Sequence, residues 1–224
     1  MRMIGVMIGC ALILAAVPGW AGTTTINFAN GIGPLSYQSG SGRLQASGGR
    51  AVFTGVNSTM LASNGSPVAA NGTITATMSL NPYPDALNGV GLVMVDTSDL
   101  GNMLTAIVDG NTGQVTLMGW MELYTTVDFT YPAALNSMTL QYDVYTDRAT
   151  LTLNGSQSVF LDEALGGAYS VYVGVGANGP GGFASFSATG NGIPVYPPPP
   201  EPPNGITAKP RKSPTTAGKM PAPT

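Results

Sequence analysis

The chain has no histidine, and its single cysteine, Cys10, lies near the amino terminus. Without imidazole it cannot use Ser-His-Asp or Cys-His catalysis, histidine-ligated zinc or an imidazole proton shuttle. If the first residues are removed, no cysteine remains and no disulfide bond can form. The folded chain would then depend for its stability on its hydrophobic core, or on a bound metal ion.

Charged side chains are also few, at 8% of the residues, and the two signs are separated along the chain. Residues 22–193 hold three arginines and no lysine against ten acidic residues, which is a net charge of −7. Residues 194–224 hold four basic residues and one acidic residue, which is a net charge of +3. An acidic body argues against nucleic acid as a partner, because binding to phosphates needs a basic surface.

Residues 1–21 have the layout of a secretory signal peptide. The positive Arg2 is followed by an apolar run from residue 3 to residue 17, a Pro-Gly break and the small Ala21. We expect cleavage after Ala21. The run is shorter than the ~18 apolar residues of a spanning helix, so we expect no membrane insertion once the leader is removed. The predicted location is secreted, either extracellular or at the cell surface, with the periplasm as the alternative.

Residues 22–193 are predicted to form one all-β domain. Segments that alternate apolar and polar residues, such as "GTITATMSL" and "SMTLQYDVY", are separated by Gly, Asn, Ser and Asp. This pattern is typical of strands joined by tight turns, and about eleven to thirteen such segments are present. Repeated Asn-Gly pairs suit antiparallel hairpins, because both residues accept positive φ angles. We expect a two-sheet antiparallel sandwich with a single core.

From residue 194 the composition changes to "PVYPPPPEPPNGITAKPRKSPTTAGKMPAPT". Consecutive prolines favour an extended polyproline II spacer, and the remainder has too little apolar content to support a core. Residues 194–224 are therefore predicted to be a disordered, basic tail.

The order of features in the second half resembles the laminin-G-type jelly roll of the concanavalin A-like lectin and glucanase superfamily. The resemblance lies in "GVGLVMVD", "NMLTAIVDGNTGQVTLM", "SMTLQYDVYTDRATLTLNG" and "YVGVGANGPGGFASFSATG", with Ser185 where many relatives carry aspartate. These are packing and turn signatures. The resemblance implies the jelly-roll fold and a habit of binding carbohydrate, protein or calcium, and it implies no activity.

The segment "VDTSDLGN" is a candidate calcium loop. Asp96, Asp99 and Asn102 are predicted to lie together between two strands, and calcium prefers oxygen ligands on flexible loops. The resemblance likewise implies calcium at the rim of the sandwich. The alternative is that Asp, Ser and Asn hold the turn by bonding to their own backbone, without a metal. Calcium is the only cofactor that the sequence suggests.

Paired carboxylates for glycoside hydrolysis are not recognisable. That chemistry needs two carboxyl groups facing each other at ~5 to 9.5 Å, and the E-x-D-x-E triplet of the glucanase relatives is missing. On a strand, Asp143 and Asp147 would lie about 13 Å apart, and the adjacent Asp162 and Glu163 would face opposite ways. A pair drawn from different strands stays open. We predict no catalytic residues and a protein that is not an enzyme.

An aromatic row is the second candidate site. Strict alternation in "GWMELYTT" would put Trp120, Glu122 and Tyr124 on one face of a strand, with Met121 and Leu123 on the other. If the second pair faces the core, the row faces outward and suits carbohydrate stacking. The alternative is that Trp120 covers a sheet edge or packs beneath a loop.

Two further expectations concern the core. Alternation places Tyr142 inside, and methionine commonly fills irregular core space. We therefore expect core positions for the seven methionines of the domain: Met60, Met78, Met94, Met103, Met118, Met121 and Met138.

Together these features predict a secreted or surface binding module, without enzymatic activity, that recognises a glycan or an extracellular protein. The first alternative is a structural component that self-associates in a matrix, fibre or surface layer, since an open sheet edge can template association. The second alternative is a jelly-roll glycoside hydrolase.

Overall fold

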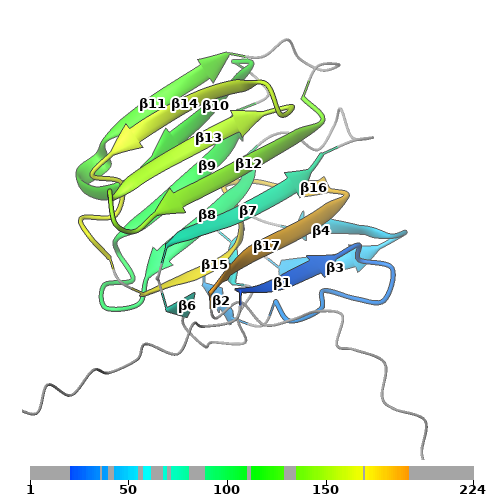
Figure 1. Cartoon of the computed structure of the whole chain (residues 1–224). Coiled ribbons are helices and arrows are strands. Elements are labelled where there is room, and N and C mark those ends of the chain that lie inside the picture. Colours follow the sequence, from blue (N-terminus) through cyan, green and yellow to red (C-terminus); the bar gives the residue numbers. More distant parts are fainter. Residues whose placement is uncertain are drawn as a thin grey trace, which may run out of the picture.

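The computed structural model describes residues 21–35, 37–39, 43–54, 58–61, 68–69, 72–80, 89–109, 112–128, 135–168 and 170–191. These residues form seventeen β-strands and a 3₁₀ turn, with no α-helix among them (Figure 1). No described helix is long and apolar enough to cross a membrane. The predicted tail and all but the last residue of the predicted signal peptide lie outside the described residues.

Sheet A has six antiparallel strands. Their order is β1 (Ala21–Ile26), β17 (Ser185–Asn191), β7 (Thr73–Ser79), β12 (Ser137–Asp143), β13 (Arg148–Leu153) and β14 (Gln157–Asp162). Its outward positions are mostly threonine and serine, whose hydroxyls bond across strands, as between Thr77 and Thr139 at 3.1 Å. Threonine suits this half-exposed surface because its branched side chain fits the pleated backbone.

Sheet B has eight strands and lies opposite sheet A. Seven follow the order β11 (Tyr124–Asp128), β10 (Gln114–Met118), β9 (Met103–Asp109), β8 (Val90–Asp96), β15 (Ser170–Ala177), β5 (Ser58–Leu61) and β2 (Tyr37–Ser39). The eighth, β6 (Val68–Ala69), pairs with β15. The predicted antiparallel sandwich is therefore confirmed.

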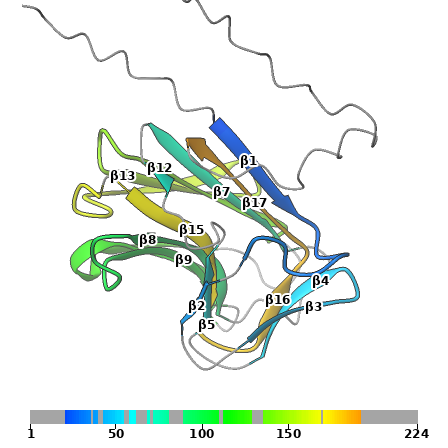
Figure 2. The ribbon, with the colours of Figure 1, turned by 90° about the horizontal axis from the view of Figure 1, so that it is seen from below.

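A third sheet, which the sequence did not reveal, lies at one end of the sandwich (Figure 2). Sheet C consists of β16 (Gly181–Phe183), β4 (Arg50–Thr54) and β3 (Arg43–Ser47). The ring of Phe183 packs edge-on against Phe28 at 5.2 Å and lies 6.1 Å from Phe53. All three rings are buried, so this end of the sandwich is filled by aromatic side chains.

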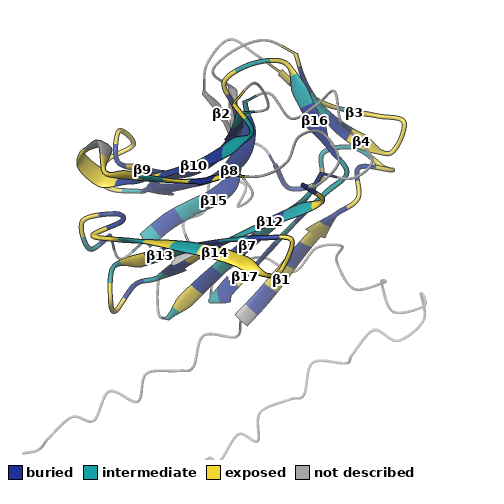
Figure 3. Ribbon diagram, turned by 90° about the horizontal axis from the view of Figure 1, so that it is seen from above, coloured by how far each residue is buried: buried dark blue, intermediate teal, exposed yellow. Residues whose placement is uncertain are grey.

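The core lies between the facing sides of sheets A and B, where Figure 3 shows buried residues in both. Alternate residues of each strand point inward, as Leu140 and Tyr142 do in β12 and Leu92 and Met94 do in β8. Tyr142 is fully buried, as predicted. Each large apolar side chain of this kind stabilises the fold by about 1.5–3 kcal/mol when it leaves water.

The expectation that the methionines fill the core is wrong for three of them. Met78, Met94 and Met138 are buried, whereas Met103, Met118 and Met121 are exposed. The burial of Met60 lies outside what the structure describes. Met103 and Met118 alternate with core residues of β9 and β10, so they face outward from sheet B.

Candidate functional site

A groove opens at one end of sheet B, where the loop between β8 and β9 meets the turn between β10 and β11. Its volume is about 440 Å³. We call it the rim groove, and its lining residues are Asp99, Gly101, Asn102, Met103, Met118, Gly119, Trp120 and Met121. The two candidate sites of the sequence therefore contribute to one groove, since Asp99 and Asn102 lie beside Trp120.

The turn between β10 and β11 is not the strand that alternation predicted. Residues Trp120–Glu122 form a 3₁₀ turn, η2, in which Met121 has a φ angle of 53°. The N–H of Gly119 bonds to the Leu123 carbonyl oxygen at 2.9 Å, which closes the turn before β11 begins at Tyr124.

Because of this turn, the side chains of its residues do not point where the sequence predicted. Met121 and Leu123 are 73% and 41% exposed and do not enter the core, while Trp120 and Tyr124 are 39% and 70% exposed. The side chain of Glu122 lies outside the described residues. The aromatic residues are thus exposed because the chain turns there, and their role as ligand contacts stays a prediction.

Trp120 is supported from one side by the loop between β14 and β15, residues 163–168. Its backbone N–H donates to the Ala164 carbonyl oxygen at 2.9 Å. A Cβ atom on Gly166 would lie 3.0 Å from the indole Cδ2 atom, so the ring rests on glycine backbone. Trp120 was predicted either to face outward or to pack beneath a loop. Both descriptions hold in part, because one side of the indole packs on the loop and the rest is exposed to solvent.

The loop between β8 and β9 is held by its own polar side chains. Asp96 Oδ1 accepts hydrogen bonds from the N–H and the hydroxyl of Ser98, each at 2.8 Å. Asp99 Oδ1 accepts the Gly101 N–H at 2.9 Å. Asn102 Nδ2 donates to the Leu165 carbonyl oxygen at 2.9 Å, while its Oδ1 is buried without a hydrogen-bond partner.

These contacts use oxygens of the predicted calcium ligands. One oxygen of each aspartate already serves the backbone of the turn, and Asp96 is only 8% exposed. Within the described ranges, no three acidic or other metal-ligating side chains come together. Asn102 Oδ1 is the buried side-chain oxygen of this loop without a hydrogen-bond partner, whereas calcium takes about six to eight oxygen ligands. Calcium binding by Asp96, Asp99 and Asn102 stays a prediction.

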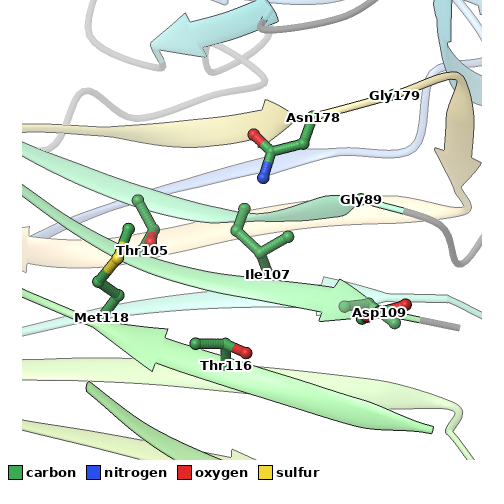
Figure 4. A pocket seen from close by; sticks show the side chains of 9 residues that line it. Gly89, Thr105, Ile107, Asp109, Thr116, Met118, Asn178 and Gly179 are labelled. Carbon is green, nitrogen blue, oxygen red and sulfur yellow. The ribbon is translucent and has the colours of Figure 1, made fainter. Parts of the chain in front are cut away.

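A second groove, of 420 Å³, lies along β9 and β10 on the outward face of sheet B. We call it the sheet groove; it shares Met118 with the rim groove. Figure 4 shows Thr105 beside Met118 at one end, Asp109 at the other and Asn178 above Ile107. Its wall is mixed, with hydroxyl and amide groups next to apolar side chains.

Sequence reasoning missed the methionines and Asn178. Alternation did contain a signal for Met118, because Val115 and Leu117 of the same strand are buried and Met118 must then face outward. Nothing in the sequence shows that Asn178, which follows β15, reaches the groove beside β9. That proximity comes from sheet pairing and from the bond between the Asn178 N–H and the Gly89 carbonyl oxygen at 2.7 Å.

The acids considered for hydrolysis serve other contacts. Asp143 ends β12 and accepts the N–H groups of Tyr145 and Thr146, and Asp147 lies in the turn that follows. Asp162 bonds to Arg148 at 2.6 Å on the surface. This hydrogen bond lowers the pKa of Asp162 and raises that of Arg148. None of these aspartates lines either groove.

The arrangement of the sheets matches known structures. Arcelin-5, a lectin-like defence protein from Phaseolus vulgaris, superimposes with a TM-score of 0.55 at 11% sequence identity, over 75% of this chain and 97% of that chain. This chain has a concanavalin A-like fold. The resemblance to that superfamily is confirmed at the level of the fold, while its laminin-G-type branch stays a prediction.

Two further structures are similar to this concanavalin A-like domain with TM-scores below that of arcelin-5. The carbohydrate recognition domain of Emp47p scores 0.48 at 12% identity, over 74% of this chain and 93% of that chain. A prokaryotic β-1,3-1,4-glucanase (lichenase) derived from a mouse hindgut metagenome has a TM-score of 0.49 at 8% identity, over 76% of this chain and 99% of that chain. No family model matches the chain, and no curated protein matches its sequence.

Proposed function

We propose that this protein is a secreted binding module, without enzymatic activity, that holds a neutral glycan in the rim groove. The observation that carries the proposal is the position of Trp120. Its indole is partly exposed, rests on Gly166 and lines a groove together with Asp99 and Asn102.

This combination suits a sugar. An aromatic face packs against the apolar C–H face of a pyranose ring, while a carboxylate such as that of Asp99 accepts hydrogen bonds from its hydroxyls. Among the described lining residues Asp99 is the only charged one, and its negative charge disfavours an acidic sugar. The fold supports the proposal by analogy, since arcelin-5 is described as lectin-like.

The described carboxylates argue for binding without hydrolysis. Cleavage of a glycosidic bond needs two carboxyl groups at ~5 to 9.5 Å from each other. Among the lining residues, the rim groove has one carboxylate, Asp99, and the sheet groove has one, Asp109. Asp109 and Asp99 lie at opposite ends of β9. They are therefore too far apart, at about 20 Å along the strand, for a shared mechanism.

A glycan array tests the proposal directly. The full-length protein, Trp120→Ala and Tyr145→Ala should be compared on the same array. Tyr145 is a matched control because it is also an exposed aromatic residue, at 79%, and lines neither groove. We expect binding by the wild type and by Tyr145→Ala and its loss in Trp120→Ala. Absence of binding by the wild type, or equal loss in both variants, would contradict the proposal.

A protein contact at the same rim is the second candidate. Seven large apolar side chains between residues 100 and 124 are exposed, and contiguous apolar surface often marks an interface. They are Leu100, Met103, Met118, Trp120, Met121, Leu123 and Tyr124. If the partner is a second copy, size-exclusion chromatography will show a mass that rises with concentration, and Met121→Ser will reduce that rise.

A further inference from the structure

The loop of residues 163–168 contacts both halves of the rim groove. The Ala164 carbonyl oxygen accepts the Trp120 N–H at 2.9 Å, and the Leu165 carbonyl oxygen accepts Asn102 Nδ2 at 2.9 Å. Gly166 lies under the indole. Three consecutive residues therefore set the position of the aromatic ring and of the amide, although neither shares a strand with them.

The other side of this loop is tied to the side chain of Asp147, and at its end the Tyr142 hydroxyl makes a longer contact with the Ala168 carbonyl oxygen, at 3.4 Å. Its Oδ1 accepts the Leu165 N–H at 3.0 Å, and its Oδ2 accepts the Gly167 N–H at 2.8 Å. Its backbone carbonyl oxygen accepts the Ala164 N–H at 2.9 Å. The loop needs such an anchor, because Glu163, Gly166 and Gly167 all have positive φ angles and no regular pairing.

The carboxylate is in turn oriented from within the core. The buried Tyr142 hydroxyl donates to Asp147 Oδ1 at 3.0 Å. The two carboxylate oxygens of Asp147 thus accept three hydrogen bonds, two from N–H groups and one from a hydroxyl. Such a site needs a side chain that has acceptor atoms and no donor. A carboxylate is such a group, whereas an amide would present an N–H to at least one of those donors.

We infer that Asp147 is a positioning residue for the ligand site, which sets Trp120 and Asn102 through the loop of residues 163–168. The inference rests on the proposed function. Asp147 lines neither groove, so it acts on a ligand only through this loop.

Asp147→Asn tests the carboxylate while it preserves the turn. Asp147 has a φ angle of 49°, which asparagine also adopts readily. Asp143→Asn is the matched control. Asp143 accepts two backbone N–H groups in the same turn, at 2.9 and 3.1 Å from Tyr145 and Thr146, and has no described contact with the loop.

The fluorescence of Trp120 provides a readout that needs no ligand. The chain contains only two tryptophans, so Trp20→Phe in the full-length protein leaves Trp120 as the single indole. In that background we expect Asp147→Asn to shift the emission to longer wavelength and to increase quenching by acrylamide. We expect Asp143→Asn to leave both unchanged, even where the two variants lose comparable stability. Equal effects in the two variants, or no effect in Asp147→Asn, would overturn the inference.

Tyr142→Phe serves as the second variant if Asp147→Asn does not fold. It removes one of the three bonds to the carboxylate, together with the longer contact between the hydroxyl and the Ala168 carbonyl oxygen at 3.4 Å, and it leaves both N–H bonds from the loop to Asp147, so we expect a smaller shift in the same direction. An unchanged Trp120 emission in Tyr142→Phe would then overturn the inference.

Binding to the glycan with the strongest wild-type signal on the array completes the test. We expect loss of most of that signal in Asp147→Asn and its retention in Asp143→Asn. Absence of any wild-type signal would contradict the proposed function alone, because the fluorescence comparison would still decide whether Asp147 positions Trp120. Retained binding in Asp147→Asn would show that the loop position does not govern the site.

Discussion

The indole of Trp120 lies against Gly166, so closely that a Cβ atom on the glycine would come within 3.0 Å of the ring. The two residues belong to different loops, and the missing side chain at residue 166 is what allows the contact. This relationship makes Gly166 part of the candidate site although it has no side chain of its own.

Gly166→Ala should therefore displace Trp120. The substitution adds a methyl group against the indole and places alanine at a φ angle of +59°, which costs about 1–2 kcal/mol. Gly48→Ala is the control, since Gly48 has the same φ angle and nothing within 4 Å of the added Cβ. We expect both variants to lose stability in urea unfolding, and only Gly166→Ala to change the Trp120 emission. Identical emission in the two variants would contradict the close packing of ring and glycine.

Asn102 should matter for stability because it joins two loops from within the protein. Asn102→Ala removes the shorter of the two hydrogen bonds to the Leu165 carbonyl oxygen, which keeps only the Ala168 N–H at 3.3 Å, and a lost hydrogen bond of this kind costs about 0.5–1.5 kcal/mol. Thr112→Ala, in the exposed turn after β9, should change the free energy of unfolding by no more than about 0.5 kcal/mol. Urea denaturation of both variants measures the difference. A cost as small as that of Thr112→Ala would show that water replaces the lost bond.

Stability should fall at alkaline pH because of Tyr142. Burial, then the hydrogen bond to Asp147 and nearby carboxylates, raise the pKa of this phenol above its ordinary value. The folded protein therefore holds the proton more tightly than the unfolded chain does. This stabilisation is complete below the unfolded pKa of about 10 and is lost as the pH rises from there through the folded pKa.

The measurement is the free energy of unfolding against pH for the wild type and Tyr142→Phe. We expect the wild type to lose stability more steeply above about pH 10, since phenylalanine has no proton to lose. Parallel curves would mean that the Tyr142 hydroxyl is not shielded in the folded protein.

Calcium should have little effect on thermal stability. The carboxylates of Asp96 and Asp99 already accept backbone N–H groups of their own turn, so the turn is held without a metal ion, and within the described residues no three His, Cys, Asp or Glu side chains come together. We expect the same melting temperature with calcium and with chelator. A specifically bound ion at 100 times its Kd would instead stabilise the protein by about 2.7 kcal/mol. An increase that Asp99→Asn abolishes would establish the calcium loop and refute our reading of these bonds.

Much of the architecture was predictable because it depends on local chemistry. Alternation located most strands, and it placed Tyr142 inside because the side-chain period of a strand is two. It failed at Trp120, where a 3₁₀ turn replaces the expected strand. The third sheet was also missed, since β3 and β4 form a local hairpin but β16 joins them only through residues that are distant in sequence, such as Val52 and Gly182.

The sequence by itself determined the all-β sandwich, the absence of histidine chemistry and the two segments that carry candidate ligands. Only the tertiary structure decided that these segments share one groove and that residues 163–168 hold them together. The reason is physical. Strand periodicity depends on residues that are neighbours in the sequence. The hydrogen bonds between Asp147 and Leu165 and between Leu165 and Asn102 instead join residues that are 18 and 63 positions apart. The first of these bonds needs β14 to pair with β13 in sheet A, and the second forms only when sheet A has packed on sheet B.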